Sequence, residues 1–424
     1  MKAVIMAGGR GTRIASICHD IPKPMLPLCG KPVLERQIER LSAEGFRDIV
    51  LVIGYLGHVI KQHFGDGSAF GVSISYVEEN EPLGTAGALA LMREQLAGDD
   101  FLLLCGDLLF DVDLSRFLAY HREKGGLSTI LAHPNDHPFD SSILRTDKEG
   151  RVTAWLGKDE PREFYPNRVN AGLHFFSPRV LDRFTEVKKT DLDRDVLRPL
   201  MLEGQLYAYD SPEYVKDMGR PERLAEAEAD LLSGRVAGCN LKHRRKAVFL
   251  DRDGTVNVYH PFLANKEDLA LCDRAAEAIR AINRAGLLAI VVTNQPMIAR
   301  GELTPAELDE IHEKLATLLG REGAYIDDLL YCPHHPHKGF EGEVPELKVV
   351  CSCRKPEPGL LLEAAARYNI DLSASYMVGD READAEAGRR AGCHTAAIGD
   401  FDAELHGSDL YDCVMQILER EKRL

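Results

Sequence analysis

The sequence has no apolar run that approaches the ~20 residues needed to span a bilayer. Its start, MKAVIMAGGRG, lacks the long apolar core and the small-residue cleavage site of a signal peptide. It also lacks an excess of basic residues, because 52 Lys and Arg stand against 67 Asp and Glu, for a net charge of −15. We therefore expect a cytoplasmic protein that binds neither nucleic acid nor a membrane surface.

Internal repeats and low-complexity tracts are absent too, so the sequence is typical of globular domains. Its 424 residues exceed one ordinary domain and favour two hydrophobic cores. In a reducing compartment the ten cysteines are expected to be core residues or metal ligands. In an acidic chain, the basic residues that matter should gather locally around small anionic ligands.

The first half shows the rhythm of an α/β domain. Residues 2–107 alternate short apolar runs such as DIVLVIG with helical patterns such as TAGALALMREQL. Between residues 127 and 176 the pattern becomes strand-rich, and the helix-like PERLAEAEADLLSG follows. We expect a first domain over residues 1–232 that consists of a sheet with a β-rich insertion.

A second domain begins after residues 233–245, a segment without clear periodicity that we predict to be the linker. Its basic cluster KHRR is interpreted as a solvated linker rather than a nucleic-acid patch. From residue 246 to 424, strands such as AVFLD and LLAIVVTN again alternate with helices. We expect this half to be a doubly wound α/β domain.

A glycine-rich loop, AGGRGTR, directly follows the first predicted strand. Glycines there let main-chain N–H groups approach phosphate oxygens closely. Further charged residues stand at strand ends or in tight loops. The candidate residues are Gly8, Gly9, Gly11, Arg13, Lys23, Asp107 and Asp217. Two cations suit a triphosphate and a sugar phosphate, and two carboxylates suit Mg²⁺, which neutralises charge as one phosphate attacks another.

The motifs around these residues are GGRGTR, PKPM…GKP, PLGTAGAL, GD and DMGRPE. In this order they resemble the sugar-1-phosphate nucleotidyltransferases over residues 1–232, and the resemblance implies a Rossmann-like nucleotidyltransferase fold. The segment 81–89, EPLGTAGAL, would lie against the nucleobase, with Gly84 allowing close approach. This segment looks most like that of the mannose- and heptose-1-phosphate guanylyltransferases, which favours GTP.

The same resemblance implies a function for each charged residue. Arg13 would steady the departing pyrophosphate, and Lys23 would contact the reacting phosphates. Asp107 and Asp217 would hold Mg²⁺.

The chain departs from the family at the sugar contacts. The family usually carries EKP before its NAG strand, where this chain has WLGKDEP. Lys158 keeps a cation for the phosphate, but Gly157 supplies no carboxylate. Asn170, in VNAGLHFF, is a candidate sugar contact, although an Asn ahead of a strand is as often a turn residue.

The second half opens with KAVFLDRDGTVN, a predicted strand that runs into Asp251 and Asp253. At the carboxyl edge of a parallel sheet, two such carboxylates repel each other unless a cation or a proton lies between them. One can then act as a nucleophile bound to Mg²⁺, and the other as a general acid and base. The alternative is a solvated pair that caps a helix.

Three further motifs follow in order, with Thr293 in VVTNQ, Lys355 in CRKPEPG and Asp380 in YMVGD. Together with DRDGT they resemble the four motifs of the haloacid dehalogenase superfamily of phosphatases. The resemblance implies that Asp251 attacks phosphorus, while Asp253 protonates the leaving oxygen and then activates water. It implies that Thr293 and Lys355 hold the phosphoryl group. The implied Mg²⁺ ligands are Asp251, Asp380 and the carbonyl of Asp253.

The stretch CPHHPHKGFEGEVPELKVVCSCRKP carries a possible metal cluster. Its candidate ligands are Cys332, His334, Cys351 and Cys353, with His335 and His337 as alternatives. Three thiolates and one imidazole satisfy a structural Zn²⁺ with no open position. Unrelated core cysteines are the other interpretation, which the polar intervening sequence disfavours.

This zinc loop resembles two phosphatase branches, histidinol-phosphate phosphatase and D-glycero-D-manno-heptose 1,7-bisphosphate 7-phosphatase. The long spacer, the CPHHP opening and TNQ…IARG match the heptose branch better. Where heptose enzymes usually have TNQSGIARG, this chain has Pro296 and Met297, so its anomer preference or substrate breadth is expected to differ. Asn294 and Arg354 are candidate substrate contacts.

Together the resemblances imply a bifunctional enzyme with Mg²⁺ in both domains and Zn²⁺ in the second. It would remove the 7-phosphate of the heptose bisphosphate and couple the resulting heptose 1-phosphate to GTP. One alternative keeps both chemistries with another sugar phosphate or nucleotide, such as a mannose 1-phosphate guanylyltransferase fused to a histidinol-phosphate-type phosphatase. Another is a phosphatase with a non-catalytic domain that senses nucleotide sugars. Small-molecule substrates are the expected partners.

Overall fold

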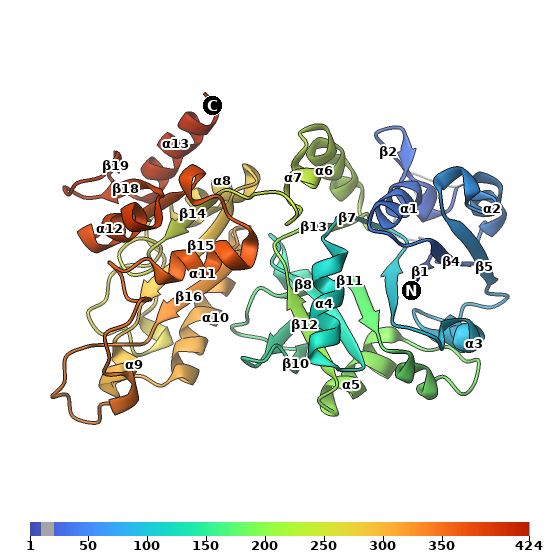
Figure 1. Ribbon diagram of the computed structural model, residues 1–424, viewed down its shortest axis with the longest axis horizontal. Helices are drawn as coiled ribbons and strands as arrows, with labels where there is room; N and C mark the ends of the chain where they lie inside the picture. The colour runs from blue at the N-terminus through green and yellow to red at the C-terminus, as the bar shows by residue number, and fades with distance from the viewer. Residues whose placement is uncertain (10–20, 424) are drawn as a thin grey trace. The chain divides into compact units, whose positions relative to one another are not determined.

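The structure is a computed structural model that describes residues 1–9 and 21–423 (Figure 1). The chain forms two compact units. Unit 1 comprises Met1–His133, Leu144–Trp155 and Asn170–Asn240, and unit 2 comprises Pro134–Ile143, Leu156–Val169 and Leu241–Leu424. The change of unit after Asn240 falls inside the predicted linker 233–245.

Two short segments from the first half of the sequence belong to unit 2. In one of them, the Tyr165 main-chain N–H donates to Thr317 Oγ1 at 2.9 Å, across 152 positions of sequence. Arg168 Nη2 likewise donates to the main-chain oxygen of Asp327 at 2.8 Å. Contacts of this range leave no local pattern, so the sequence did not indicate them.

The main sheet of unit 1 has the strand order β10-β9-β11-β6-β1-β4-β5, with β8 beside β11 and β12 beside β8. Its strands are β1 Lys2–Met6, β4 Asp48–Ile53, β5 Ser73–Glu78, β6 Phe101–Cys105, β8 Ser128–His133, β9 Ile143–Thr146, β10 Val152–Leu156, β11 Val169–Phe176 and β12 Leu206–Asp210. Strand β1 runs parallel to both β4 and β6, and its apolar run is buried on both faces. Strand β1 ends at Met6, and Ala7 leads from it to Gly8 and Gly9.

Short ribbons and helices complete this unit. Two small sheets pair β2 Pro27–Leu28 with β3 Lys31–Pro32, and β7 Leu108–Asp111 with β13 Tyr214–Asp217. The helices are α1 Val33–Ala43, α2 Gly57–Phe64, α3 Arg93–Leu96, α4 Leu114–Lys124, α5 Arg198–Leu202, α6 Pro221–Leu232 and α7 Arg235–Gly238. A short π-helix covers Leu192–Leu197. The ribbon β7–β13 pairs Asp217 with Leu108, the residue that directly follows Asp107.

Unit 2 is built on a parallel sheet of order β16-β15-β14-β17-β18-β19. Its strands are β14 Ala247–Leu250, β15 Leu288–Asn294, β16 Asp328–Cys332, β17 Tyr376–Gly379, β18 His394–Ile398 and β19 Leu405–Gly407. Its helices are α8 Ala275–Arg284, α9 Met297–Arg300, α10 Pro305–Arg321, α11 Gly359–Tyr368, α12 Glu382–Ala391 and α13 Leu410–Glu421. Helix α10 begins with a capping box between Thr304 and Glu307, and Pro305 occupies its first position.

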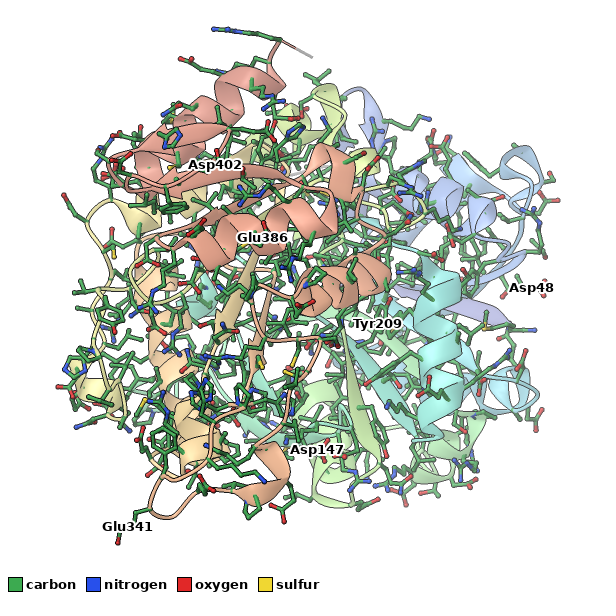
Figure 2. All side chains as sticks on the ribbon, turned by 60° about the vertical axis from the view of Figure 1, so that its left-hand side comes forward. Asp48, Asp147, Tyr209, Glu341, Glu386 and Asp402 are labelled. Atoms are coloured by element: carbon green, nitrogen blue, oxygen red, sulfur yellow. The ribbon has the colours of Figure 1, made fainter. Side chains whose placement is uncertain are left out.

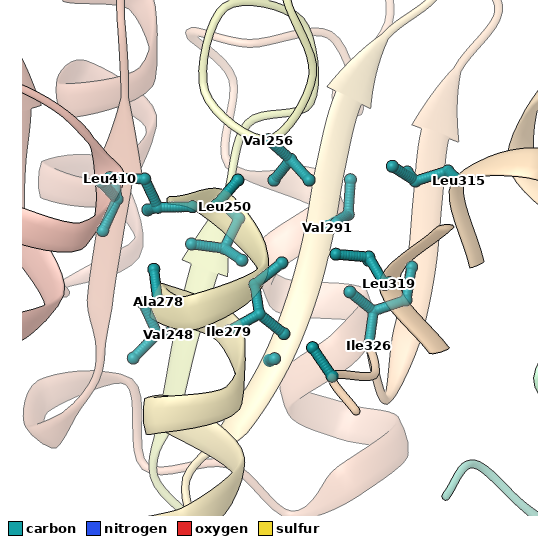
Figure 3. Close-up of a cluster of buried hydrophobic side chains, with 14 of the residues drawn as sticks. Val248, Leu250, Val256, Ala278, Ile279, Val291, Leu315, Leu319, Ile326 and Leu410 are labelled. Carbon is teal, nitrogen blue, oxygen red and sulfur yellow. The ribbon is translucent and has the colours of Figure 1, made fainter. Parts of the chain in front are cut away.

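The residues of β14 alternate between two hydrophobic cores. Val248 and Leu250 pack with Ile279 of α8 on one face of the sheet (Figure 3). Ala247 and Phe249 pack with Leu361 of α11 on the other face. Helices therefore cover both faces, which confirms the predicted doubly wound α/β fold.

The surface carries the excess of acidic residues. Side chains such as Asp48, Glu341 and Asp402 are exposed (Figure 2). Within the described residues, no helix combines the length and the hydropathy that a membrane span requires.

Candidate active sites

The unit 2 site lies at the carboxyl edge of its sheet. Asp251 directly follows β14, Asp380 follows the neighbouring β17, and Thr293 lies near the end of β15. Because these strands are parallel neighbours, their ends meet at one edge, where open α/β sheets bind ligands. Lys355 comes from the loop before α11, and its Nζ donates to Asp251 Oδ1 at 2.5 Å. The structure therefore brings the four predicted motifs together.

Asp384 joins this site through its contact with Lys355. Its Oδ1 lies 2.6 Å from Lys355 Nζ, and both side chains are buried. Asp384 is not among the predicted site residues, although it lies four residues after Asp380. Its position close to Asp380 in the sequence made it a possible candidate. Only the structure shows that its carboxylate contacts Lys355.

Several buried carboxylates meet here and favour a cation. Carboxylate oxygens of Asp251, Asp380 and Asp384 lie within 4.8 Å of one another. Burial raises the pKa of Asp251, against the opposing effect of Lys355, and burial followed by Asp251 raises the pKa of Asp380. Asp380 Oδ1 is buried without a hydrogen-bond partner among the described residues. These features suit the oxygen-ligand chemistry of Mg²⁺.

Asp253 is held by donors on both of its oxygens. Arg252 Nη2 lies 2.9 Å from Oδ1 and 2.9 Å from Oδ2. Gln295 Nε2 donates to Asp253 Oδ2 at 2.9 Å and to Thr293 Oγ1 at 2.9 Å, and Asn257 Nδ2 donates to Oδ1 at 3.1 Å. Gln295 and Asn257 were not among our candidates, and they tie the predicted general acid to the predicted phosphate-binding Thr.

Asn294 and Arg354, the candidate substrate contacts of unit 2, form hydrogen bonds with main-chain groups of the protein. Asn294 accepts from the Lys355 main-chain N–H at 3.0 Å and donates to the Lys355 main-chain oxygen at 3.1 Å. Arg354 Nη1 donates to the main-chain oxygen of His334 at 3.2 Å. In the structure, then, Asn294 holds the main chain of Lys355, and Arg354 contacts the Cys/His loop.

The predicted zinc ligands form one compact cluster. Cys353 Sγ lies 3.2 Å from Cys332 Sγ, 3.3 Å from Cys351 Sγ and 3.2 Å from His334 Nδ1. A tetrahedral zinc with thiolate bonds of about 2.3 Å places its ligand atoms about 3.7 Å apart, close to this spacing. The alternative ligand His335 instead lies 3.3 Å from Arg300 Nη2 through its Nε2. The donor set and its spacing fit a closed structural zinc site.

The unit 1 site gathers charges beside the β7–β13 ribbon. Lys23 Nζ forms an ion pair with Asp107, and Asp217 pairs with Arg223. Asp217 pairs with Leu108 across the ribbon, and Leu108 directly follows Asp107 in the sequence. The Met218 main-chain N–H also donates to the main-chain oxygen of Asp107 at 2.8 Å. Lys23, Asp107 and Asp217 thus come together, whereas Gly11 and Arg13 lie outside the described residues.

The predicted base-binding segment is held by close backbone contact. Gly84 has φ +81°, and an added Cβ would collide with the main-chain oxygen of Thr190. The two residues form a parallel bridge. Glycine is therefore required at position 84 both for the left-handed backbone and for this approach.

Glu79 is a further candidate site residue, which no motif in the sequence indicated. It follows β5, and a Cβ built on Gly8 would lie 2.8 Å from its Oε2. Burial raises the pKa of Glu79, against the opposing effect of a hydrogen bond from the Leu83 main chain. Its Oε1 is buried without a hydrogen-bond partner in the part of the chain that the structure describes. The Glu79 carboxylate thus lies close to Gly8 of the glycine-rich loop and to Leu83 of the predicted base-binding segment.

The two candidate sugar contacts, Asn170 and Lys158, belong to different units. Asn170 Oδ1 accepts from the Gly172 main-chain N–H at 2.9 Å, a local contact within strand β11. Lys158 is exposed and lies in the Leu156–Val169 segment, which packs within unit 2. Burial raises the pKa of Asp193 to about 6, with a contribution from Asp191.

A profile of the nucleotidyl transferase family matches residues 2–234, which is more than half of the chain. The chain belongs to the nucleotidyl transferase family. A HAD-hydrolase-like profile matches residues 352–407 in the second half of this transferase. Both resemblances drawn from the motifs are thereby confirmed, together with the two-domain α/β fold, and the chain combines domains of two enzyme families.

Known relatives of the transferase half differ in their nucleotide. Mannose-1-phosphate guanylyltransferase of Mycobacterium tuberculosis is 36% identical over 236 residues, covering 55% of this chain and 65% of the relative. UTP–glucose-1-phosphate uridylyltransferase of Synechocystis is 34% identical over 250 residues, covering 56% and 64%. This nucleotidyl transferase thus spans somewhat less than two thirds of the length of these relatives.

A solved structure also matches the second half. It is D,D-heptose 1,7-bisphosphate phosphatase from B. bronchiseptica, complexed with magnesium and phosphate. The match covers 41% of this chain and 99% of the solved chain, with 30% identity and a TM-score of 0.37.

Proposed function

We propose that the protein is a bifunctional enzyme of nucleotide-sugar synthesis. Unit 2 removes the 7-phosphate from D-glycero-D-manno-heptose 1,7-bisphosphate. The nucleotidyl transferase then couples the resulting heptose 1-phosphate to GTP, giving GDP-heptose and pyrophosphate. The observation that carries the proposal is the meeting of Lys355, Asp251 and Asp253 at one sheet edge, in a chain whose other half belongs to the nucleotidyl transferase family.

In the phosphatase reaction Asp251 is the nucleophile. Its carboxylate attacks phosphorus, and the bond from phosphorus to the sugar oxygen breaks with its electron pair on that oxygen. Asp253 gives the leaving oxygen a proton. Asp253 then takes a proton from water, whose oxygen attacks the aspartyl-phosphate and frees phosphate and the Asp251 carboxylate. Lys355, held by Asn294, is placed to neutralise the phosphoryl oxygens.

Both units offer carboxylate side chains as ligands for a divalent metal ion. Asp251, Asp380 and Asp384 would hold Mg²⁺ in unit 2, where the unpartnered Asp380 Oδ1 offers a ligand. Bound there, the ion would supply positive charge to the phosphoryl group. Asp107 and Asp217 would hold Mg²⁺ in unit 1. Zinc at the Cys332 cluster is structural in this proposal, because all four positions are filled by side chains.

In the transferase reaction a phosphate oxygen of the sugar phosphate attacks the α-phosphorus of GTP. The bond to the pyrophosphate oxygen breaks with its electron pair on that oxygen, so no proton transfer is needed. Lys23 is placed to neutralise phosphate charge, and Arg13 is proposed to steady the pyrophosphate.

Glu79 supports guanine as the base. Guanine presents two adjacent donors, N1–H and N2–H₂, and a carboxylate offers two acceptors and no donor. Uracil and thymine present one donor flanked by two carbonyl oxygens, which a carboxylate would repel. The buried Oε1 of Glu79 therefore fits guanine better than it fits a pyrimidine.

The order of the two reactions follows from their chemistry. Removing the 7-phosphate leaves a sugar 1-phosphate, which is the kind of acceptor that the transferase half uses. The heptose assignment rests on the long zinc-loop spacer, the CPHHP opening and the IARG segment. The similarity to a mannose-1-phosphate guanylyltransferase favours mannose 1-phosphate as the second candidate for the transferase half.

The test is to incubate the whole protein with Mg²⁺, GTP and the heptose bisphosphate while following phosphate and pyrophosphate separately. Release of both, with GDP-heptose formed, is the expected result. Phosphate without pyrophosphate would overturn the transferase assignment, and a panel with mannose 1-phosphate and UTP would then identify its substrates. Release of neither would overturn the joint function.

A further inference from the structure

Asp253, the proposed general acid, is held by a guanidinium that is itself held by a histidine. Arg252 is only 1% exposed, and its Nη2 lies 2.9 Å from each carboxylate oxygen of Asp253. At its other edge, Arg252 Nη1 lies 3.1 Å from Nε2 of His312. These three side chains form a hydrogen-bonded chain that begins on helix α10 and ends on the catalytic carboxylate.

The histidine is suited to accept from the guanidinium. Burial, and then the charge of Arg252, hold the pKa of His312 well below its usual range, so the imidazole is neutral. An unprotonated Nε2 can therefore accept the Nη1–H of Arg252. Because a buried guanidinium with an unpaired N–H is costly, the orientation of Arg252 depends on this acceptor.

Arg252 in turn sets the orientation of the carboxylate. Gln295 contacts Asp253 Oδ2 alone, and Asn257 contacts Oδ1 alone. Arg252 reaches both oxygens, and a planar guanidinium that bridges two oxygens fixes the plane of the carboxylate. If Arg252 lost its orientation, only the single contacts from Gln295 and Asn257 would remain to hold the Asp253 carboxylate.

We propose that His312 is a positioning residue for Asp253 in the phosphatase reaction. The inference rests on the proposed phosphatase function and extends it to a side chain that acts only through Arg252. It concerns the step in which the phosphorus–oxygen bond breaks and the leaving oxygen takes the proton of Asp253. A poor leaving group needs that proton, whereas an acidic leaving group departs without it.

The experiment compares leaving groups in single turnovers of the full-length protein with Mg²⁺. The probes are 2,4-dinitrophenyl phosphate, 4-nitrophenyl phosphate and phenyl phosphate, with leaving-group release as the signal. We expect H312A to slow phenyl phosphate by about tenfold, a fraction of the usual general-acid contribution, and 2,4-dinitrophenyl phosphate by less than about twofold. H312Q keeps an acceptor for Arg252 and should restore the parent pattern.

Tyr331 provides the control for packing. Its ring lies 5.9 Å from the His312 ring, so Y331F perturbs the same neighbourhood and should leave the leaving-group dependence unchanged. If H312A does not fold, H312L and H312Q make the same comparison with side-chain bulk retained.

Three outcomes would overturn the inference. Equal slowing of all three esters by H312A would make His312 merely structural, and an unchanged rate would make it dispensable. A parent protein that hydrolyses none of the esters would remove the phosphatase function itself, and the inference with it.

Discussion

Lys355 Nζ lies 2.5 Å from Asp251 Oδ1, although the two residues are 104 positions apart. The same ammonium group lies 2.6 Å from Asp384 Oδ1. One buried cation therefore serves two buried carboxylates, and in the proposed reaction it would also neutralise the phosphoryl group. The proposed phosphatase reaction and the stability of unit 2 would therefore depend on the same ion pair.

Replacing Lys355 by Met should affect both properties. Phosphate release should fall on the order of 10³-fold, because the phosphoryl oxygens lose their cation. The free energy of unfolding should fall by about 3–5 kcal/mol, because Asp251 and Asp384 are left buried without their partner. Colorimetric phosphate assays and denaturant unfolding measure the two effects. Pyrophosphate release with heptose 1-phosphate supplied directly serves as the control and should not change. A stable but inactive K355M would contradict the structural half of the prediction.

Removing one cluster thiol should release the zinc. In C351S we expect the metal content to fall by about one zinc per chain, because three ligands remain where a structural site needs four. The melting temperature of the protein should fall with it. Metal analysis of protein purified without chelator is the measurement. C272S, which changes a cysteine outside the cluster, is the control, and equal zinc in both variants would refute the assignment.

Asp193 makes stability depend on pH. Its pKa in the folded protein is about 6, above its ordinary value of 3.8, and burial is the main cause. Between these values the folded state binds more protons than the unfolded state, so stability falls as pH rises, and the penalty is complete above pH 6. D193N should therefore raise the unfolding free energy at pH 8 by up to about 3 kcal/mol and change it little at pH 4.

Asp195 provides the opposite control for that experiment. A hydrogen bond from Arg194 and one from the Asp191 main chain lower its pKa to about 2. D195N should not stabilise the protein at pH 8. If D193N and D195N behave alike in unfolding at both pH values, burial of the Asp193 carboxylate is not the cause.

Changing Glu79 to Gln should shift the nucleotide preference. A Gln amide offers one donor and one acceptor, so it can pair with uracil but no longer suits both guanine donors. We expect the ratio of kcat/KM for GTP to that for UTP to fall by about 10–100-fold. Pyrophosphate release with each nucleotide measures the ratio. E78Q is the matched control, because Glu78 pairs with Lys61 at the surface, and an unchanged ratio in E79Q would exclude Glu79 from base recognition.

Much of the catalytic site could be predicted because its parts follow strands. Asp251, Thr293 and Asp380 each stand at the end of an apolar run, and parallel strands carry their ends to one edge. The cysteine cluster could be predicted for a different reason, because its ligands stand in a Cys-x-His pair and a Cys-x-Cys pair at the two ends of one loop.

Other features could not be predicted, because they depend on contacts without a local pattern. Glu79 comes close to Gly8 because the parallel strands β1, β4 and β5 end at the same edge of the sheet, and the sequence does not show that β5 lies only two strands from β1. Asn294 was interpreted as a substrate contact, yet its amide holds the main chain of Lys355. Nothing around Tyr165 indicated that its segment belongs to unit 2.

The sequence by itself determined which side chains are available for chemistry, since strand periodicity and motif spacing are local properties. It determined the α/β class of both halves for the same reason. Only the tertiary structure decided which charges share a partner, such as the two carboxylates on Lys355 and the histidine on Arg252. Those choices depend on how distant elements pack, because burial forces each charge to find a partner among whatever side chains the fold brings near.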